Sequence, residues 1–411
     1  MTVLSADIGT SSLKAALINE DGLPLAQSRI PFYLYGTSHA STEWLSAFFQ
    51  AVEKMRSSCC ARSIPFTPDA VCISGNGPTV VSDDGTTLLW KEAISVESSV
   101  QTPSLFLPRI AFFKEQHFLS YRISKHLFSG PEFLLWQLTG RAVTILPEER
   151  FTPAYWTEAD AFCSEQKIDT SKFPPFVTPG TFLGGLHCSI KSCPQDLVDL
   201  PVFAGAPDFV AALVGTNTLQ EGCLCDRAGS SEGINLCTNK ALSHPLIRTL
   251  PSVIPGLWNA SVLLPDTGSR FSAYRQLVER TQGHTVSHAD IVHTLLSDDT
   301  KDTCITDKAV LSQGKALIQD ISNQIVQAVT TLTEEAQKAG SALPHALAVT
   351  GGQASNAEWN AYKSKLTGLE LHVPLCTDAE LIGDAIFAFC GIKTFKNIRE
   401  AAQKLCKRKD A

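Results

Sequence analysis

Short, mostly apolar runs separated by turn residues fill the first part of the chain. Residues 3–7, 13–19 and 23–30 have the pattern of three strands, and clusters of Gly, Ser and Asp between them mark tight turns. Apolar residues recur at helical spacing over residues 43–55, and the continuous apolar run at 70–74 is typical of a buried strand. The pattern therefore predicts a meander of strands, then a helix, then a further buried strand.

A similar order of elements returns in the second half. After a loop-rich stretch that leads up to residue 201, a buried strand at 201–205 precedes a helix that starts at Pro207-Asp208. The later elements are a hairpin of strands 222–226 and 233–237, a long helix at 309–338, a strand at 346–349, and helices at 356–367 and 379–390. Because strands and helices alternate, the sequence predicts an α/β protein, which we divide into domains 1–220 and 221–411.

Composition narrows the class of ligand. The chain has 411 residues and a net charge of −7, which argues against binding that depends on neutralising nucleic-acid phosphates. Its 13 cysteines are scattered without a C-x-x-C pair, as expected of thiols in a reducing compartment. The first residues lack the basic and apolar regions of a signal peptide, and no apolar run reaches the length needed to span a membrane. We expect a cytoplasmic protein with a small-molecule ligand and no nucleic-acid or membrane partner.

Three groups of residues could carry chemistry. Asp7 ends a predicted strand just before the small residues of G-T-S-S at 9–12, so that a carboxylate for a hard cation stands beside backbone donors for phosphate. The turn G-S-S at 229–231 lies about half a chain later, and G-G-Q-A-S-N at 351–356 links a strand to a helix. Each group has an ordinary alternative: an Asx turn, a Gly-Ser turn, and a helix cap. Asp208 could likewise be only an acidic helix start.

Taken together, these segments resemble the FGGY carbohydrate kinase family, in the family's order and across the whole chain. The segments that carry the resemblance are D-I-G-T-S-S-L-K at 7–14, A-G-A-P-D at 204–208, G-S-S at 229–231, V-T-G-G-Q-A-S-N-A-E-W at 349–359 and I-G-D-A at 382–385. The resemblance implies two ribonuclease-H-like domains of the actin-like ATPase superfamily, with nucleotide and sugar meeting in an interdomain cleft. It also implies an ATP-dependent transfer of the γ-phosphate to a hydroxyl of a pentulose, hexulose, glycerol-like or other small polyol substrate, with Mg²⁺ as cofactor.

The resemblance also assigns roles to individual residues. Asp208 is implied as the catalytic base and Asp7 as the residue that holds Mg²⁺. The implied phosphate-binding residues are Gly9, Thr10, Ser11, Ser12, Lys14, Gly229, Ser230 and Ser231, and the adenosine-binding residues are Gly351, Gly352, Gln353 and Asn356. Substrate contacts are expected from Asn76, Gly77, Glu92 and Asp208.

The wall expected to contact the sugar departs from the family pattern. Where the family has S-G-Q-M or N-Q-R-E, this chain has S-G-N-G-P at 74–78, and the family's W-x-D-x-R is W-K-E-A-I at 90–94. Because glycine and proline side chains donate no hydrogen bonds, two sugar contacts are missing. The alternative functions are therefore a catalytically weakened pseudokinase or a sugar- or nucleotide-sensing binding protein. An actin-like ATPase that acts on a protein partner is a third alternative, and a homodimer is left open.

Overall fold

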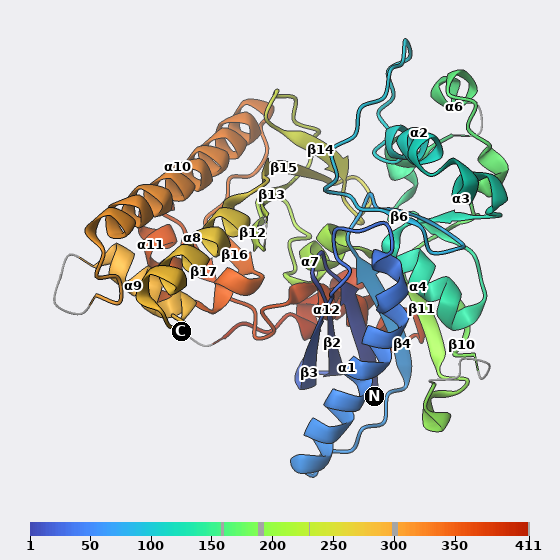
Figure 1. Ribbon diagram of the computed structural model, residues 1–411, viewed down its shortest axis with the longest axis horizontal. Coiled ribbons are helices and arrows are strands. Elements are labelled where there is room, and N and C mark those ends of the chain that lie inside the picture. Colours follow the sequence, from blue (N-terminus) through green and yellow to red (C-terminus); the bar gives the residue numbers. More distant parts are fainter. Residues whose placement is uncertain (158–159, 188–192, 230, 298–302, 410–411) are drawn as a thin grey trace. The chain divides into compact units, whose positions relative to one another are not determined.

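The computed structural model describes residues 1–157, 160–187, 193–229, 231–297 and 303–409, and the chain forms two compact units (Figure 1). Unit 1 comprises Met1–Asn217 and Asp378–Lys407, and unit 2 comprises Thr218–Thr377 and the chain from Arg408. The chain first passes from unit 1 to unit 2 after Asn217, whereas the sequence analysis placed the domain boundary after residue 220. The segment Asp378–Lys407, which the sequence analysis assigned to the second domain, packs in unit 1 instead.

Unit 1 is built on a six-stranded mixed sheet in the order β10-β11-β4-β1-β2-β3. Its strands are β1 (Thr2–Ile8), β2 (Ser12–Asn19), β3 (Pro24–Pro31), β4 (Ala70–Gly75), β10 (Phe182–Gly185) and β11 (Pro201–Pro207). The β1-β2-β3 meander is antiparallel, as predicted, whereas β4 runs parallel to both β1 and β11. The carboxyl ends of β1, β4 and β11 therefore meet at one edge of the sheet.

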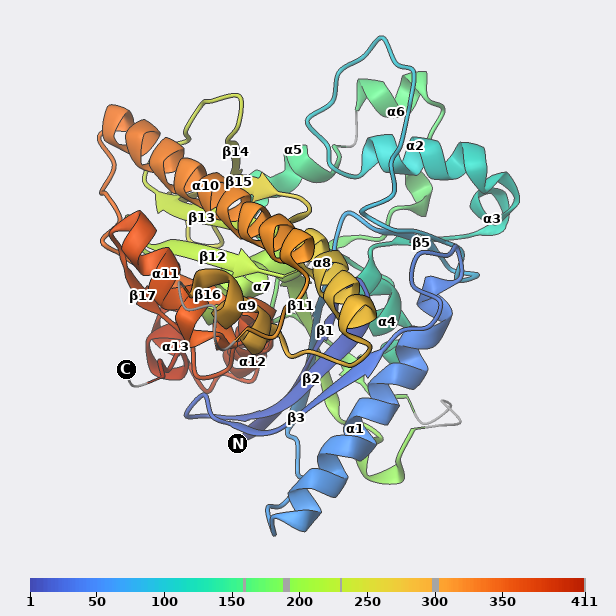
Figure 2. The same ribbon diagram turned by 60° about the vertical axis from the view of Figure 1, so that its left-hand side comes forward.

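Helices cover both faces of this sheet (Figure 2). Alternate residues such as Leu4, Ala6 and Ile8 pack into a core with α1 (Trp44–Ala61) and α4 (Gly130–Thr139). The opposite face packs against α7 (Asp208–Gly215) and α12 (Ala379–Gly391). A Cβ atom on Gly215 would lie 1.9 Å from the carbonyl oxygen of Ala379, so the contact between α7 and α12 is close enough to require glycine.

The remaining elements of unit 1 are short. They are β5 (Val80–Ser82), β6 (Thr87–Leu88), α2 (Leu107–Gln116), α3 (Phe118–Ile123), β7 (Leu127–Phe128), β8 (Thr144–Ile145), α5 (Thr152–Tyr155), α6 (Ala161–Glu165), β9 (Phe176–Val177) and, near the chain's end, α13 (Ile398–Leu405). Helix α4 begins with a capping box, in which the Glu132 carboxylate accepts from the backbone N–H of Ser129 at 2.7 Å.

Unit 2 repeats the architecture with the sheet order β14-β15-β13-β12-β16-β17. Its strands are β12 (Leu224–Ala228), β13 (Glu232–Thr238), β14 (Arg248–Pro251), β15 (Trp258–Leu264), β16 (Ala346–Thr350) and β17 (Glu370–His372). Its helices are α8 (Thr267–Gln282), α9 (His288–Leu296), α10 (Lys308–Ala339) and α11 (Ala357–Thr367). In both units an antiparallel hairpin begins the sheet and a parallel strand joins its first strand.

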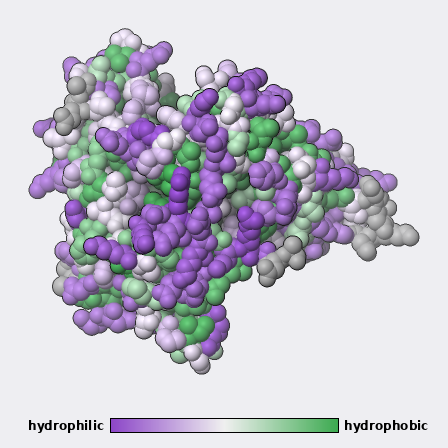
Figure 3. Space-filling model, turned by 180° about the vertical axis from the view of Figure 1, so that it is seen from behind, coloured by the Kyte–Doolittle hydropathy of each residue, from purple (hydrophilic) through white to green (hydrophobic). Residues whose placement is uncertain are grey.

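Hydrophilic and hydrophobic residues are interspersed over the face that Figure 3 shows. Among the described residues, no helix combines the length and the apolar character that crossing a bilayer requires.

Candidate active site

Three polar residues meet where β1, β4 and β11 end in unit 1. Asp7 of β1 pairs in register with Ser74 of β4, and Pro207 of β11 pairs with Gly75. Asp208 follows Pro207 directly and opens helix α7. Because all three strands run in the same direction, their register brings Asp7 and Asp208, which are distant in sequence, to the same edge of the sheet.

Asp7 is buried, with 2% of its surface exposed. Burial is the main reason that the pKa of Asp7 rises to about 8; Lys14 opposes this increase, whereas the nearby acids Glu380, Asp208 and Asp378 add to it. The carboxyl group thus keeps its proton near neutral pH unless further positive charge arrives. A cluster of acids with so little compensating charge is suited to a cation.

Lys14 provides positive charge beside Asp7. It lies opposite Asp7 in the β1–β2 hairpin, and its Nζ is 2.9 Å from Asp378, 3.8 Å from Asp7 and 3.9 Å from Glu380. Burial lowers the pKa of Lys14, but Glu380, Asp378 and Asp7 outweigh it and raise the pKa above its usual value. Lys14 is therefore charged, and the two acids of 378–380 were not anticipated from the sequence.

The predicted phosphate turn at residues 9–12 is a tight hairpin. The backbone N–H of Gly9 donates to the carbonyl of Ser12 at 3.0 Å, and the Thr10 hydroxyl accepts from the indole N–H of Trp90 at 3.2 Å. Ser11 is exposed, whereas Ser12 is buried. The turn is therefore exposed to solvent at Ser11 and held in place at Thr10 by the hydrogen bond from Trp90.

Asp208 is the first residue of α7 and is partly buried. One of its carboxylate oxygens accepts the backbone N–H of Phe209 at 2.6 Å. A carboxylate in the first turn of a helix is favoured in its charged form by the helix dipole. Asp208 thus combines partial exposure, a fixed orientation and proximity to Asp7.

Asp384 of α12 is a fully buried acid behind this edge of the sheet. Its Oδ2 accepts the Ser74 hydroxyl at 2.8 Å, and that hydroxyl lies 3.5 Å from Asp7 Oδ1. A Cβ atom on Gly205 of β11 would lie 2.9 Å from Asp384 Oδ1, so the carboxyl group is packed against that strand as well. Burial raises the pKa of Asp384 well above its usual value, with Asp7 and Glu380 adding to the increase. Burial therefore favours the protonated form of Asp384, which contacts β4 through Ser74 and β11 at Gly205.

Replacing Asp384 tests this link. Asp384→Ala leaves the Ser74 hydroxyl without its acceptor, so we expect the free energy of unfolding to fall by about 1–3 kcal/mol. Asp384→Asn keeps the shape of the side chain and an acceptor oxygen for the Ser74 hydroxyl, so we expect a smaller loss. Urea unfolding of both variants measures the difference. Equal losses in the two variants would contradict the hydrogen-bond explanation.

Among the other residues expected to contact the substrate, the side chains of Asn76 and Glu92 have partners within the protein. Asn76 is 4% exposed; its amide donates to the Ile8 carbonyl at 3.0 Å and accepts from the Thr79 hydroxyl at 2.8 Å. The Glu92 carboxylate accepts the Leu89 N–H at 2.7 Å. Gly77 contributes no side chain.

In unit 2, the second predicted phosphate turn lies between β12 and β13. The N–H of Gly229 donates to the Ser231 carbonyl at 3.0 Å, while Ser230 lies outside the described residues. Gly351, at the end of β16, has a φ of +92°, and a Cβ atom there would lie 2.5 Å from the Ala228 carbonyl oxygen. Two segments expected to bind one nucleotide are thus in direct backbone contact.

The other residues of the predicted adenosine segment organise the turn after β16. Asn356 caps α11 by accepting the N–H of Trp359 at 2.9 Å, and the Gln353 side chain accepts the Trp359 indole N–H at 2.9 Å. Gly352 is exposed, with open space where a side chain would start. The helix-cap alternative considered for Asn356 is therefore present in the geometry, which does not exclude ligand contacts by the exposed backbone at Gly352.

The two adjacent glycines offer a matched test. Gly351→Ala forces an unfavourable φ and a clash with the Ala228 carbonyl, so we expect a loss of about 1–3 kcal/mol in the free energy of unfolding. Gly352→Ala meets open space, and we expect a change within about 0.5 kcal/mol. Thermal and urea unfolding of both variants provide the comparison. Similar losses in the two variants would contradict the close approach at Gly351.

Unit 2 also holds a buried charge cluster that the sequence analysis missed. The Lys363 ammonium of α11 lies 2.5 Å from Asp226 of β12 and 2.6 Å from Glu232 of β13, and all three side chains are at most 2% exposed. Burial, followed by Glu232, raises the pKa of Asp226 to about 8, although Lys363 opposes this. Near neutral pH Asp226 therefore favours its protonated form beside the Lys363 ammonium. It joins α11 to both strands that flank the second turn.

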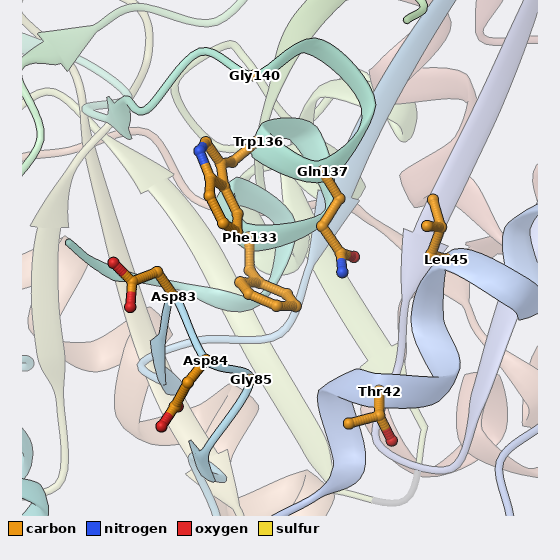
Figure 4. A pocket seen from close by; sticks show the side chains of 9 residues that line it. All are labelled: Thr42, Leu45, Asp83, Asp84, Gly85, Phe133, Trp136, Gln137 and Gly140. Carbon is orange, nitrogen blue, oxygen red and sulfur yellow. The ribbon is translucent and has the colours of Figure 1, made fainter. Parts of the chain in front are cut away.

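A separate hollow of about 570 Å³ lies beside α1 and α4 in unit 1 (Figure 4). Its lining comprises Thr42, Leu45, Asp83, Asp84, Gly85, Phe133, Trp136, Gln137 and Gly140. None of the residues predicted to bind nucleotide or sugar lines it. The strand ends that carry Asp7 and Asp208 therefore remain the candidate site in unit 1.

Comparisons with known proteins address the fold of the chain. No family model matches the sequence. A human protein described as "FGGY carbohydrate kinase domain-containing protein" is 20% identical over 98% of this chain and 91% of its own length. Among solved structures, xylulose kinase from Lactobacillus acidophilus matches with a TM-score of 0.75 at 13% identity, and covers 100% of this chain and 93% of its own. Glycerol kinase from Plasmodium falciparum, solved with ADP, matches with a TM-score of 0.77 at 13% identity and the same coverage.

The two units and their full-length structural matches define an α/β protein with the actin-like ATPase fold. The chain has, more narrowly, the fold of the FGGY carbohydrate kinases, and the resemblance drawn from its sequence is confirmed at distant identity.

Proposed function

We propose that this protein is an ATP-dependent carbohydrate kinase that transfers the γ-phosphate to a hydroxyl of a small sugar or polyol. The observation that carries the proposal is the meeting of Asp208 with Asp7 and Lys14 at adjoining strand ends of unit 1. This edge provides an oriented and partly exposed carboxylate beside a buried acid cluster. Phosphoryl transfer needs positioning and charge compensation, which such an edge can supply.

In this proposal Asp208 accepts the proton of the acceptor hydroxyl. The hydroxyl oxygen forms a bond to the γ-phosphorus as the bond between that phosphorus and the β,γ-bridging oxygen breaks, so that ADP leaves and a phosphate ester forms. Gly9, Thr10, Ser11, Ser12 and Lys14 of unit 1, with Gly229, Ser230 and Ser231 of unit 2, would contact the phosphates. Gly351, Gly352, Gln353 and Asn356 would bind the adenosine.

The residues of unit 1 fit Mg²⁺ through water rather than as a full set of direct ligands. Among the described residues, no group of three or more His, Cys, Asp or Glu side chains is arranged to hold a metal directly. Asp7 would hold the ion, which keeps most of its water and binds the phosphates. The ion would neutralise charge on the transferred phosphoryl group. Its binding would oppose the burial and the neighbouring acids that together raise the pKa of Asp7.

One observation favours the alternative of a weakened kinase or a binding protein of the same fold. Asn76 and Thr79 are the polar side chains that flank the missing sugar contacts, and the Asn76 amide already donates to the Ile8 carbonyl and accepts from Thr79. Fewer free hydrogen-bonding groups would reduce the binding energy available for a hydroxylated substrate.

Measuring ADP release with a panel of ketoses and polyols separates the two functions. The kinase proposal expects carbohydrate-dependent ADP release in the presence of Mg²⁺. The alternative expects nucleotide or sugar to raise the melting temperature with no carbohydrate-dependent release. Absence of both effects would contradict both functions.

A further inference from the structure

A series of contacts within unit 2 joins the second predicted phosphate turn to the predicted adenosine segment. It begins at Glu232, the first residue of β13 after the turn at 229–231. The Glu232 carboxylate accepts from the Lys363 ammonium of α11 at 2.6 Å. That ammonium also lies over the ring of Trp359, 5.5 Å from its centroid. Lys363 therefore contacts both the end of the phosphate turn and the first turn of its own helix.

Trp359 continues the connection to the adenosine segment. Its indole N–H donates to the Gln353 side chain at 2.9 Å, and its backbone N–H donates to the Asn356 side chain at 2.9 Å. Trp359 is 3% exposed, so packing holds its ring in place. The two side chains expected to bind adenosine are therefore held by the residue that the Lys363 ammonium contacts.

A second connection runs through the backbone of β12. Asp226 of β12 accepts from the same ammonium at 2.5 Å, and Ala228 ends that strand just before the phosphate turn. The Ala228 carbonyl is the group that a Cβ atom on Gly351 would approach to 2.5 Å. Both strands that flank the phosphate turn are thus bound to one side chain of α11, and one of them also contacts the start of the adenosine segment.

Stability alone does not require charged residues at this place. The side chains of Asp226, Glu232 and Lys363 are at most 2% exposed. Taking three charged groups out of water costs free energy that their attraction only partly returns, and well-packed apolar residues of similar size often stabilise a protein as well or better. Charge-assisted hydrogen bonds, however, fix distance and direction more narrowly than apolar contacts do.

We propose that Lys363 is a positioning residue for the nucleotide, and that with Asp226 and Glu232 it holds the phosphate turn and the adenosine segment in the arrangement that one nucleotide requires. The inference rests on the proposed function, because it takes these two segments as parts of the nucleotide site. Lys363 is too deeply buried to touch the nucleotide and acts through Glu232 and Trp359. Segments that are already in place before the nucleotide arrives lose less conformational freedom when it binds.

The experiment replaces the cluster by apolar residues of similar size, with Asp226→Val, Glu232→Val and Lys363→Met combined in one triple variant. We expect the midpoint of its urea unfolding to stay at or above that of the wild-type protein. We expect its Kd for ATP with Mg²⁺, measured by calorimetry, to rise about tenfold or more. In steady-state kinetics the KM for ATP should rise by a similar factor, while the KM for the carbohydrate stays within about twofold.

Leu332→Ala is the control for a loss of stability alone. Leu332 of α10 is fully buried in the core of unit 2, so its truncation should lower the urea midpoint. It belongs neither to the cluster nor to the two segments, and the Kd of the folded variant for ATP should stay within about twofold of the wild-type value.

Trp359→Phe interrupts the connection at a second point and leaves the three charges in place. Phenylalanine keeps a ring beside the Lys363 ammonium but has no N–H to donate to Gln353. We expect the Kd for ATP to rise about threefold to tenfold, the effect of losing one hydrogen bond. Tyr362→Phe is the matched aromatic control, because the Tyr362 ring stacks on that of Trp359 with centroids 6.0 Å apart, and it should keep the wild-type Kd.

The outcomes separate the positioning role from the kinase function. A wild-type Kd for ATP in the triple variant or in Trp359→Phe would overturn the positioning role and leave the kinase function standing. So would a Kd that simply follows the urea midpoint, with Leu332→Ala weakened as well. Weaker ATP binding by both test variants, without carbohydrate-dependent ADP release by the wild-type protein, would support the positioning role and contradict the kinase function. A wild-type protein that binds no ATP would overturn both.

Discussion

Asp208→Asn is expected to lower kcat for carbohydrate-dependent ADP release by about 10²–10⁴-fold, while the affinity for nucleotide stays within about threefold. Asparagine has the size of aspartate and can still accept the N–H of Phe209, so the start of α7 should persist. It cannot accept the proton of the attacking hydroxyl. Steady-state kinetics measures kcat, and calorimetric titration with ATP measures nucleotide affinity.

Asp21→Asn is the matched control, because Asp21 lies in the exposed turn between β2 and β3 and contacts none of the acids at the sheet edge. Its kcat should equal that of the unchanged protein. Turnover by Asp208→Asn within tenfold of that value would remove Asp208 as the base. It would direct attention to the other acids near Asp7.

Lys363→Ala is expected to reduce the free energy of unfolding by about 3–5 kcal/mol, the cost of removing one partner from a buried ion pair. The change leaves Asp226 and Glu232 buried together without the ammonium that lies within 2.6 Å of each. Since the cluster connects α11 with β12 and β13, the loss should appear in the unfolding of unit 2. Urea unfolding monitored by circular dichroism measures the loss of stability, and hydrogen exchange shows whether the loss lies in unit 2.

Lys365→Ala provides the comparison, because Lys365 stands two residues later on the same helix and is exposed. We expect it to change stability by less than about 0.5 kcal/mol. If Lys363→Ala cost no more than Lys365→Ala, the cluster would not stabilise unit 2. Double replacement of Lys363 and Asp226 by apolar residues should recover part of the loss.

The sequence predicted the local elements well, because the spacing of apolar residues within a segment indicates whether that segment forms a strand or a helix. The β1–β2–β3 meander follows from short apolar runs bounded by turn residues, and α10 follows from a long helical period. The placement of Asp7 at a strand end was also predictable, since the apolar run stops there. These features depend on neighbours in the chain rather than on the tertiary fold.

Features created by long-range packing were not predictable in the same way. Asp378 and Asp384 contact Lys14 and Ser74 across more than 300 residues of sequence. Nothing in the helical pattern of 379–390 indicates that its small and acidic residues face the first sheet. Lys363 gives no local sign of burial either, because a lysine between polar neighbours is usually exposed.

The same long-range packing limits how unit 1 can be isolated. An amino-terminal fragment that stops at Asn217 would lack α12 and two of the acids beside Lys14, Asp378 and Glu380, and would expose the small-residue face of α7. A single proteolytic cut after Asn217 would leave both pieces of the unit held together without a covalent bond. Producing unit 1 alone therefore calls for fusing residues 1–217 to 378–407 through a short linker in place of unit 2.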